Sequence, residues 1–270
     1  MNEVHAVLIG VAAPAPVRWS GELGTWVTAT EPLLDSDYVF STLDGVGNDL
    51  DSFTTMITDE APAAVISRLE CPEETTFESV TAELEKHARR DPPCGCNALV
   101  IVLVGHGFQV PTSDTEETDG LDELFALSDV PLIDDWWVPF WTAARADLTA
   151  TIIVDSCHSE TIVRAAHVPE PRIVEERVSD GPRRLIISAS MDAQVAHEQS
   201  IGGKAQGLLT RELERAWTVP EYRVSYRDWY WEAALGVNAN PYQTAVMRVI
   251  DPDQTIQLGR PFTDGFIPGH

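Results

Sequence analysis

The chain has 270 residues, of which 44% are hydrophobic, so it can bury one globular core and is too apolar to be disordered throughout. Its 43 acidic and 18 basic residues give a net charge of −25, which argues against a nucleic acid polymer as partner, because phosphate binding needs a basic surface. Every apolar run is far shorter than the roughly 18 residues of a membrane span, and no signal peptide is visible, so we expect a cytoplasmic protein that does not bind membranes.

Short β-branched runs alternate with amphipathic stretches along the chain. The runs predict strands at 4–9, 64–69, 99–104, 152–154, 185–188 and 244–250. The amphipathic stretches predict helices at 48–57, 75–90, 134–146, 204–217 and 226–235. Strands that alternate with helices in this way are typical of a mostly parallel, doubly wound α/β sheet, and we expect a single domain.

Two predicted helices carry distinctive residues. Thr75-x-x-Glu78 has the spacing of a capping box at the start of a helix. The helix at 134–146 is rich in aromatic residues, and the pairs that lie four positions apart on one face are Trp136/Phe140 and Trp137/Trp141. We expect these rings to pack on the core, and a ligand site that stacks bases is the alternative.

Two long connections separate the predicted elements. Residues 13–45 are punctuated by Pro and Gly, and connections of this length in compact domains tend to be functional. Residues 168–184 are rich in Pro, Glu and Arg, and we interpret them as a linker.

A histidine and a cysteine follow two of the buried strands directly. The strand at 99–104 leads into Gly105-His106-Gly107, and the strand at 152–154 leads into Asp155-Ser156-Cys157. Open α/β sheets keep their active sites at the carboxyl ends of the strands, so both side chains are expected at the same edge. A zinc site formed by these two residues with Asp155 and His158 is the competing interpretation, but neighbouring residues at a strand end point in opposite directions.

The ordered set of motifs resembles the metacaspases and orthocaspases, which are caspase-like cysteine peptidases. The two signature turns are Val104-Gly105-His106-Gly107 and Asp155-Ser156-Cys157-His158-Ser159-Glu160, with the histidine 51 positions before the cysteine, close to the roughly 50 known for caspases. Weaker matches in the same order are His5–Gly10, Leu43–Asp49, Asp119–Glu123, Ile133–Asp135 and Ile187–Ser190. The resemblance implies a three-layer α/β/α fold with a six-stranded sheet, and a division into a large-subunit-like part (1–167), a linker (168–184) and a small-subunit-like part (185–270).

The resemblance also assigns catalytic roles. Cys157 would attack a peptide carbonyl, and His106 would act as its base and would later protonate the leaving amine. The oxyanion would be bound by the backbone N–H groups of Gly107 and Cys157. A lone buried cysteine is usually a small apolar residue, so it is the pairing of both residues at matched strand ends that favours catalysis.

Asp155 and Asp49 match the acidic residues that select Arg or Lys substrates in metacaspase-like enzymes. Residues two apart on a strand share a face, so Asp155 and Cys157 can converge on one substrate. The alternative for Asp155 is that it caps the helix that follows. The chain departs from the family pattern at two pocket positions, where Val46 replaces a cysteine and Val104 a serine.

The calcium site of the family is incomplete in this sequence. Asp122, Asp134 and Asp135 resemble three of its ligands, but the fourth acid is replaced by Arg164. Calcium needs six to eight oxygen ligands, so a fixed cation in the shell disfavours it. We therefore expect no required cofactor, and we expect calcium to be disfavoured at Asp122, Asp134 and Asp135 because of Arg164.

The sequence thus predicts a cysteine endopeptidase that cleaves peptide or protein substrates after Arg or Lys. Small caspase-like proteins can be regulated effectors of prokaryotic stress or anti-phage defence. One expectation is therefore that a signal ligand or a partner protein activates this protein. An inactive caspase-like module that binds peptides or scaffolds a complex is the alternative, and the two valines keep it open.

Overall fold

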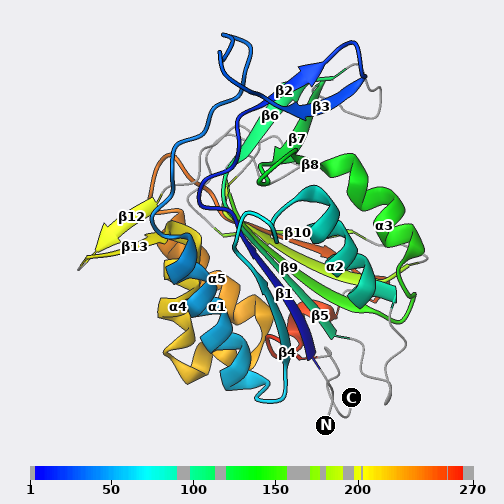
Figure 1. Cartoon of the computed structure of the whole chain (residues 1–270). Helices are drawn as coiled ribbons and strands as arrows, with labels where there is room; N and C mark the ends of the chain where they lie inside the picture. Colours follow the sequence, from blue (N-terminus) through cyan, green and yellow to red (C-terminus); the bar gives the residue numbers. More distant parts are fainter. Residues whose placement is uncertain are drawn as a thin grey trace.

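A computed structural model describes residues 4–89, 98–112, 120–156, 171–176, 181–190, 198–201, 203–253 and 255–263. Its helices cover the two faces of a central sheet, giving three layers (Figure 1). One face carries α1 (Val46–Glu60), α4 (Leu208–Trp217) and α5 (Tyr226–Val237), and the other carries α2 (Phe77–Arg89) and α3 (Trp137–Ala143). Three short 3-10 helices are η1 (Asp134–Trp136), η2 (Pro220–Val224) and η3 (Ile256–Leu258). No helix in the described ranges is long and apolar enough to cross a membrane.

The central sheet has seven strands in the order β10-β14-β11-β9-β5-β1-β4. Neighbours run parallel except β11 and β14, which are antiparallel. The strands are β1 (Val4–Gly10), β4 (Val65–Leu69), β5 (Ala98–Val104), β9 (Thr149–Asp155), β10 (Arg172–Glu176), β11 (Arg183–Ser188) and β14 (Val246–Ile250). The predicted α/β fold and mostly parallel sheet are confirmed.

The predicted count of six strands is too low by one. The extra strand, β10, lies inside the stretch interpreted as a linker and pairs in parallel with β14 at the edge of the sheet. Its sequence, Arg-Ile-Val-Glu-Glu, is charged at three of five positions. Edge strands commonly carry such charges, which hide the apolar run that marks a central strand.

The strands bury side chains on both faces of the sheet. In β5, Val100 and Val102 belong to the core under α1, α4 and α5, whereas Leu99 and Ile101 belong to the core under α2 and α3. All seven residues of β5 are buried, as expected for a strand in the middle of a parallel sheet.

Three smaller sheets were not predicted. The hairpin of β2 (Val17–Ser20) and β3 (Thr25–Thr28) lies in the long connection after β1, and the sheet β6 (Gly107–Pro111), β7 (Leu121–Phe125) and β8 (Leu132–Ile133) follows β5. The β2–β3 hairpin and the β6–β7–β8 sheet share a third apolar cluster, which includes Val17 and Phe108. The hairpin of β12 (Glu198–Ile201) and β13 (Lys204–Gly207) precedes α4.

Three predicted helix starts or ends were wrong. The helix expected at 204–217 begins only at Leu208, because the preceding residues form β13. The helix expected at 134–146 is a 3-10 turn followed by α3, which ends at Ala143. At the start of α2 it is Thr76 whose hydroxyl accepts a hydrogen bond from the N–H of Ser79 (3.3 Å), whereas the Thr75 hydroxyl donates to the Cys71 carbonyl (3.0 Å).

The aromatic residues of η1 and α3 pack on the core. Trp136 stacks on Phe140 with ring centroids 4.8 Å apart, and Trp137 stacks on Trp141 at 5.8 Å. Phe140 is buried, and the three tryptophans pack against the core under α2 and α3. This arrangement agrees with a role in packing.

Candidate active site

The carboxyl ends of β5 and β9 lie side by side at one edge of the sheet. Each residue of β5 pairs with the residue 51 positions later in β9, up to Val104 opposite Asp155. The N–H of Gly105 donates to the Asp155 carbonyl at 3.4 Å, so pairing persists to the last residue before His106. Cys157, two positions beyond β9, lies outside the described residues, as do His158 and Arg164.

His106 is oriented through one of its ring nitrogens. Its Nε2 lies 2.7 Å from the carbonyl oxygen of Ser41, and its ring centroid lies 5.4 Å from that of Phe40. A carbonyl oxygen can only accept, so Nε2 carries a proton and the neutral ring keeps Nδ1 as its acceptor. Ser41 was not predicted, because every residue has a backbone carbonyl and the sequence does not distinguish this one. Ser41 lies in the long connection at 13–45, which was expected to be functional.

The glycines on either side of His106 have different surroundings. A Cβ on Gly105 would lie 3.0 Å from the ring of Phe125 and 3.2 Å from the carbonyl oxygen of Val11, so a larger residue there would force these neighbours to shift. Gly107, the predicted oxyanion donor, is half-buried and begins β6, opposite Phe125. The turn that holds His106 is therefore fixed between the central sheet and the β6–β7–β8 sheet.

Asp49 and Asp155, predicted to share a substrate pocket, do lie together. Both are buried, and both bind the turn that opens α4. The carboxylate of Asp49 accepts from the N–H of Gly207 at 3.0 Å, and that of Asp155 accepts from the N–H and the hydroxyl of Thr210 at 2.9 and 2.6 Å. Two carboxylates from distant parts of the chain thus meet at one helix end.

Asp155 also caps a helix, α4, whereas the residues that directly follow it in the sequence, where the capped helix was expected, lie outside the described residues from 157 on. Gly207 occupies the N-cap position of α4 and has no side chain to cap it. Asp155 supplies the missing acceptor from β9, since Thr210 is the third residue of α4. A Cβ on Gly207 would overlap the Asp155 carboxylate, so the contact also depends on the glycine. Sequence reasoning missed both Gly207 and Thr210.

Burial and mutual repulsion make this acidic pair hard to ionise. Burial, followed by the charge of Asp155, raises the pKa of Asp49 to about 8, while the hydrogen bond from Gly207 acts in the opposite direction. Burial also raises the pKa of Asp155, against the hydrogen bonds from Thr210. Glu198, whose carboxylate accepts from the N–H of Gly45, adds a third negative charge and raises both. Such a group of acids favours a bound cation.

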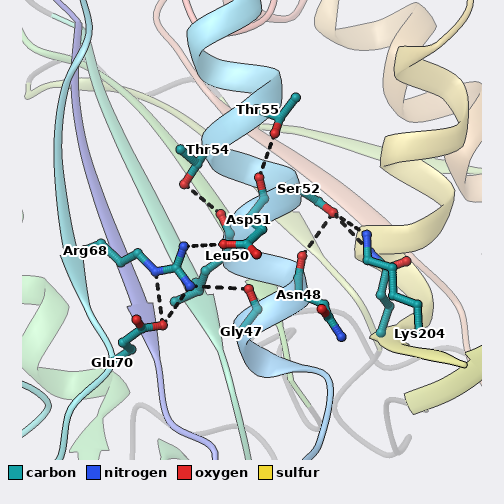
Figure 2. A network of polar contacts seen from close by, with 11 residues as sticks. Gly47, Asn48, Leu50, Asp51, Ser52, Thr54, Thr55, Arg68, Glu70 and Lys204 are labelled. Carbon is teal, nitrogen blue, oxygen red and sulfur yellow. Dashed lines mark hydrogen bonds and ion pairs between the residues drawn. The ribbon is translucent and has the colours of Figure 1, made fainter.

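The helix that carries Asp49 is held from both sides (Figure 2). On one side Arg68 of β4 binds Asp51 of α1 through Nη1 and Oδ1, at 2.5 Å. On the other side the Ser52 hydroxyl accepts from Nζ of Lys204, in β13, at 3.3 Å. The position of Asp49 is therefore tied to the edge of the central sheet and to the β12–β13 hairpin.

The two valines that depart from the family pattern belong to the main core. Val46 and Val104 are buried in the apolar cluster under α1, α4 and α5. A Cβ on Gly10 would lie 2.7 Å from Cγ1 of Val46, which shows how closely β1 and α1 pack there. The two residues supply apolar surface close to the ends of β5 and α1.

The acids predicted as remnants of a calcium site lie near η1. Burial raises the pKa of Asp134 to about 6, and the charges of Asp135 and Asp122 contribute, while the N–H of Asp135 donates to Asp134 at 2.9 Å and acts against the shift. Within the ranges that the structure describes, no three His, Cys, Asp or Glu residues are arranged to hold a metal ion. The charges of Asp122, Asp134 and Asp135 therefore act on one another close to η1.

Comparison with known proteins identifies the family. A family model described as a caspase domain matches residues 35–247. No curated protein matches the chain. Among solved structures, the crystal structure of protein GSU0716 from Geobacter sulfurreducens is similar, with a TM-score of 0.68 and 20% identity over 97% of this chain and 99% of that one. At this identity the likeness shows a shared fold.

Proposed function

Because this chain belongs to the caspase-domain family of cysteine peptidases, we propose that it is an endopeptidase that cleaves peptide bonds after Arg or Lys. The observation that carries the proposal is the buried pair Asp49 and Asp155 beside the strand end that leads to Cys157. Two buried carboxyl groups of raised pKa gain from a cationic partner and gain nothing from an acidic one, so a substrate pocket here would favour Arg or Lys.

In the proposed mechanism Cys157 is the nucleophile and His106 the base. Nδ1 of His106 takes the thiol proton, the thiolate forms a bond to the peptide carbonyl carbon, and the proton then passes to the leaving amine. Water, deprotonated by the same nitrogen, hydrolyses the thioester and restores the thiol. The N–H groups of Gly107 and Cys157 would bind the oxyanion in both steps.

The pairing of β5 with β9 supports this assignment. His106 precedes Cys157 by 51 positions, which is the offset of the β5–β9 register. If that register continued for two residues, the two positions would be opposite each other. The hydrogen bond from Nε2 to Ser41 leaves the other nitrogen for proton transfer.

An Arg side chain in the pocket would form charge-assisted hydrogen bonds with Asp49 and Asp155. Both acids are buried, so its binding would displace the proton that their raised pKa retains, and affinity should rise with pH up to about 8. Val46 and Val104 would supply the apolar surface along which the methylene groups of the side chain lie.

Regulation and location are part of the proposal. We propose activation by a signal ligand or a partner protein in place of calcium, and action in the cytoplasm, where a thiol nucleophile stays reduced. The exposed Cys71 is a free thiol, which suits that compartment.

A fluorogenic peptide series tests the proposal. Peptides that differ only before the scissile bond, with Arg, its neutral isostere citrulline, or Asp, should be cleaved in that order, with at least about a hundredfold drop from Arg to citrulline. Cys157→Ala should abolish cleavage and Cys71→Ala should preserve it. Equal turnover of the Arg and Asp peptides would refute the specificity, and full activity of Cys157→Ala would refute the mechanism.

A peptide-binding module without catalysis is the second candidate. It is favoured by the hydrogen bonds that already engage Asp49 and Asp155 at the start of α4, and by the valines at two pocket positions. Saturable binding of the Arg peptide without turnover by the wild type would support this candidate instead.

A further inference from the structure

A buried serine binds the peptide group that leads to the proposed nucleophile. The hydroxyl oxygen of Ser190 lies 3.1 Å from the carbonyl oxygen of Ser156, the residue directly before Cys157. A carbonyl oxygen can only accept, so the Ser190 hydroxyl is the donor. Ser156 and Ser190 are both buried, so bulk water does not compete for this hydrogen bond.

Ser190 lies opposite Ser156 because the alignment of β9 with β11 continues beyond the ends of both strands. β11 ends beside Val154, and the N–H of the next residue, Ala189, donates to the Val154 carbonyl at 2.9 Å. The segment is also bound by Gln243, whose side-chain amide donates to the Ala189 carbonyl at 2.9 Å. The position of the Ser190 hydroxyl is therefore set by the central sheet.

The direction of the Ser156 carbonyl determines the direction of the N–H group that follows it. The carbonyl of Asp155 faces β5, where it accepts from the N–H of Gly105 at 3.4 Å. The carbonyl of Ser156 faces the other way, toward the end of β11, where it accepts from Ser190. In a planar trans peptide the N–H points opposite to the carbonyl. We therefore expect the N–H of Cys157 to point toward the end of β5.

We propose that Ser190 is a positioning residue for the oxyanion site of the peptidase. The inference rests on the proposed function, in which the N–H groups of Cys157 and Gly107 bind the oxyanion. Gly107 begins β6 shortly after the end of β5, which is the side that the Cys157 N–H would face. By binding the Ser156 carbonyl, Ser190 keeps the two donors aimed at one point. It thus stabilises the tetrahedral intermediates without touching the substrate.

Removal of the Ser190 hydroxyl should affect the transition state more than substrate binding. In Ser190→Ala the Ser156 carbonyl loses this donor, whereas the acidic pair Asp49 and Asp155 keeps its contacts with the start of α4. We expect kcat for the Arg peptide to fall about tenfold, which is less than the hundredfold or more that loss of a whole oxyanion donor costs. KM should stay within about twofold of the wild-type value.

Two thiol reagents separate the oxyanion site from the nucleophile itself. A peptide aldehyde that ends in Arg adds reversibly to Cys157: the sulfur bonds to the aldehyde carbon, the thiol proton passes to Nδ1 of His106, and the carbonyl oxygen becomes the oxyanion. Iodoacetamide alkylates the same thiolate with loss of iodide, and no oxyanion forms. Ser190→Ala should weaken aldehyde binding about tenfold and leave the rate of Cys157 alkylation unchanged.

Ser188→Ala is the matched control, because Ser188 is also a buried serine and lies two residues earlier, opposite Val154. Each of the two alanine variants should lower the Tm by about 3 °C, but Ser188→Ala should keep the wild-type kcat and aldehyde affinity. Ser190→Cys keeps the shape of the side chain and supplies a weaker donor, so its kcat and aldehyde affinity should lie between those of the wild type and Ser190→Ala. It replaces Ser190→Ala in the test if that variant fails to fold.

The outcomes distinguish failure of this inference from failure of the proposed function. A wild type that neither cleaves the Arg peptide nor binds the aldehyde would overturn the proposed function, and the role of Ser190 with it. An active wild type whose Ser190→Ala variant keeps full kcat and aldehyde affinity would overturn the role of Ser190 alone. An equal loss of kcat in Ser188→Ala, or slower alkylation of Cys157 in Ser190→Ala, would also overturn it, because the effect would then not be specific to the oxyanion.

Discussion

Replacing Asp49 by Asn should stabilise the protein while it destroys the proposed pocket. Asp49 is buried and faces Asp155 and Glu198, with Lys204 as the cation that acts against them. An amide of the same shape can still accept from the N–H of Gly207 but never ionises. The cost of a buried negative charge therefore disappears in the variant.

The size of the effect follows from the pKa shift of Asp49. Its pKa rises from 3.8 to about 8, and each unit corresponds to about 1.4 kcal/mol, so the limit is about 6 kcal/mol. Part of this shift comes from the charge of Asp155, which titrates together with Asp49, so we expect about 2 kcal/mol, or about 5 °C in Tm. Because the folded pKa is raised, the carboxyl contributes stability that is fully present below pH about 4 and is lost as the pH rises to about 8. The advantage of Asn should grow across that range.

Urea denaturation at intervals between pH 5 and 9 measures this difference. Asp51→Asn is the matched control, because Asp51 is two residues away on α1, is exposed, and pairs with Arg68. It should lose up to about 1 kcal/mol, since the pair is at the surface. Asp49→Asn should also reduce kcat/KM for the Arg peptide by at least about a hundredfold. If Asp49→Asn were less stable than the wild type at pH 8, by a margin that does not depend on pH, the account of the acidic pair would be wrong.

Three further predictions concern the same chain. Gly207→Ala should lower the free energy of unfolding by about 1–3 kcal/mol and impair cleavage after Arg, because the new Cβ would overlap the Asp155 carboxylate. Gly47→Ala has open space around its Cβ, so it should raise the free energy of unfolding by up to about 1 kcal/mol. Denaturation curves and kcat/KM for the Arg peptide check both variants. Calcium should not be the main activator, so activity in EDTA and in millimolar calcium should agree for the wild type, and a large stimulation would show that the charge of Arg164 was given too much weight. Self-cleavage in the predicted linker should occur at the peptide bond after Arg177, because Arg172, Arg183 and Arg184 are parts of sheet strands. Mass spectrometry of the wild type and of Cys157→Ala tests this, and fragments that end at Arg183 would contradict it.

The parts of the fold that could be predicted are those whose cause is local. β5 and β9 are buried runs of β-branched and other apolar residues, and both appear at the expected places. The edge strand β10 could not be predicted, because its charges are compatible with a loop, and only pairing with β14 makes it a strand. The start of α4 was misplaced for a related reason. Its cap comes from Asp155, 55 residues away, so no capping residue marks it locally.

The candidate site also contains features that could be predicted from the sequence and features that could not. The position of His106 at a strand end followed from the pattern, whereas the roles of Asp49 and Asp155 came from family resemblance. Their meeting at Gly207 depends on contacts between residues up to 158 positions apart, which no local pattern records. The carbonyl of Ser41, which orients His106, is a backbone atom that any residue would supply.

The most direct test of the central claim is to identify which cysteine reacts with an Arg-bearing, thiol-directed peptide inhibitor. Peptide mapping by mass spectrometry after stoichiometric labelling should find one adduct, on Cys157, and that adduct should be lost in His106→Ala. Cys71 is an internal control, because it is exposed but the charge of Glu74 raises the pKa of its thiol. Adducts spread over several cysteines, or an unlabelled Cys157, would contradict the assignment of the nucleophile.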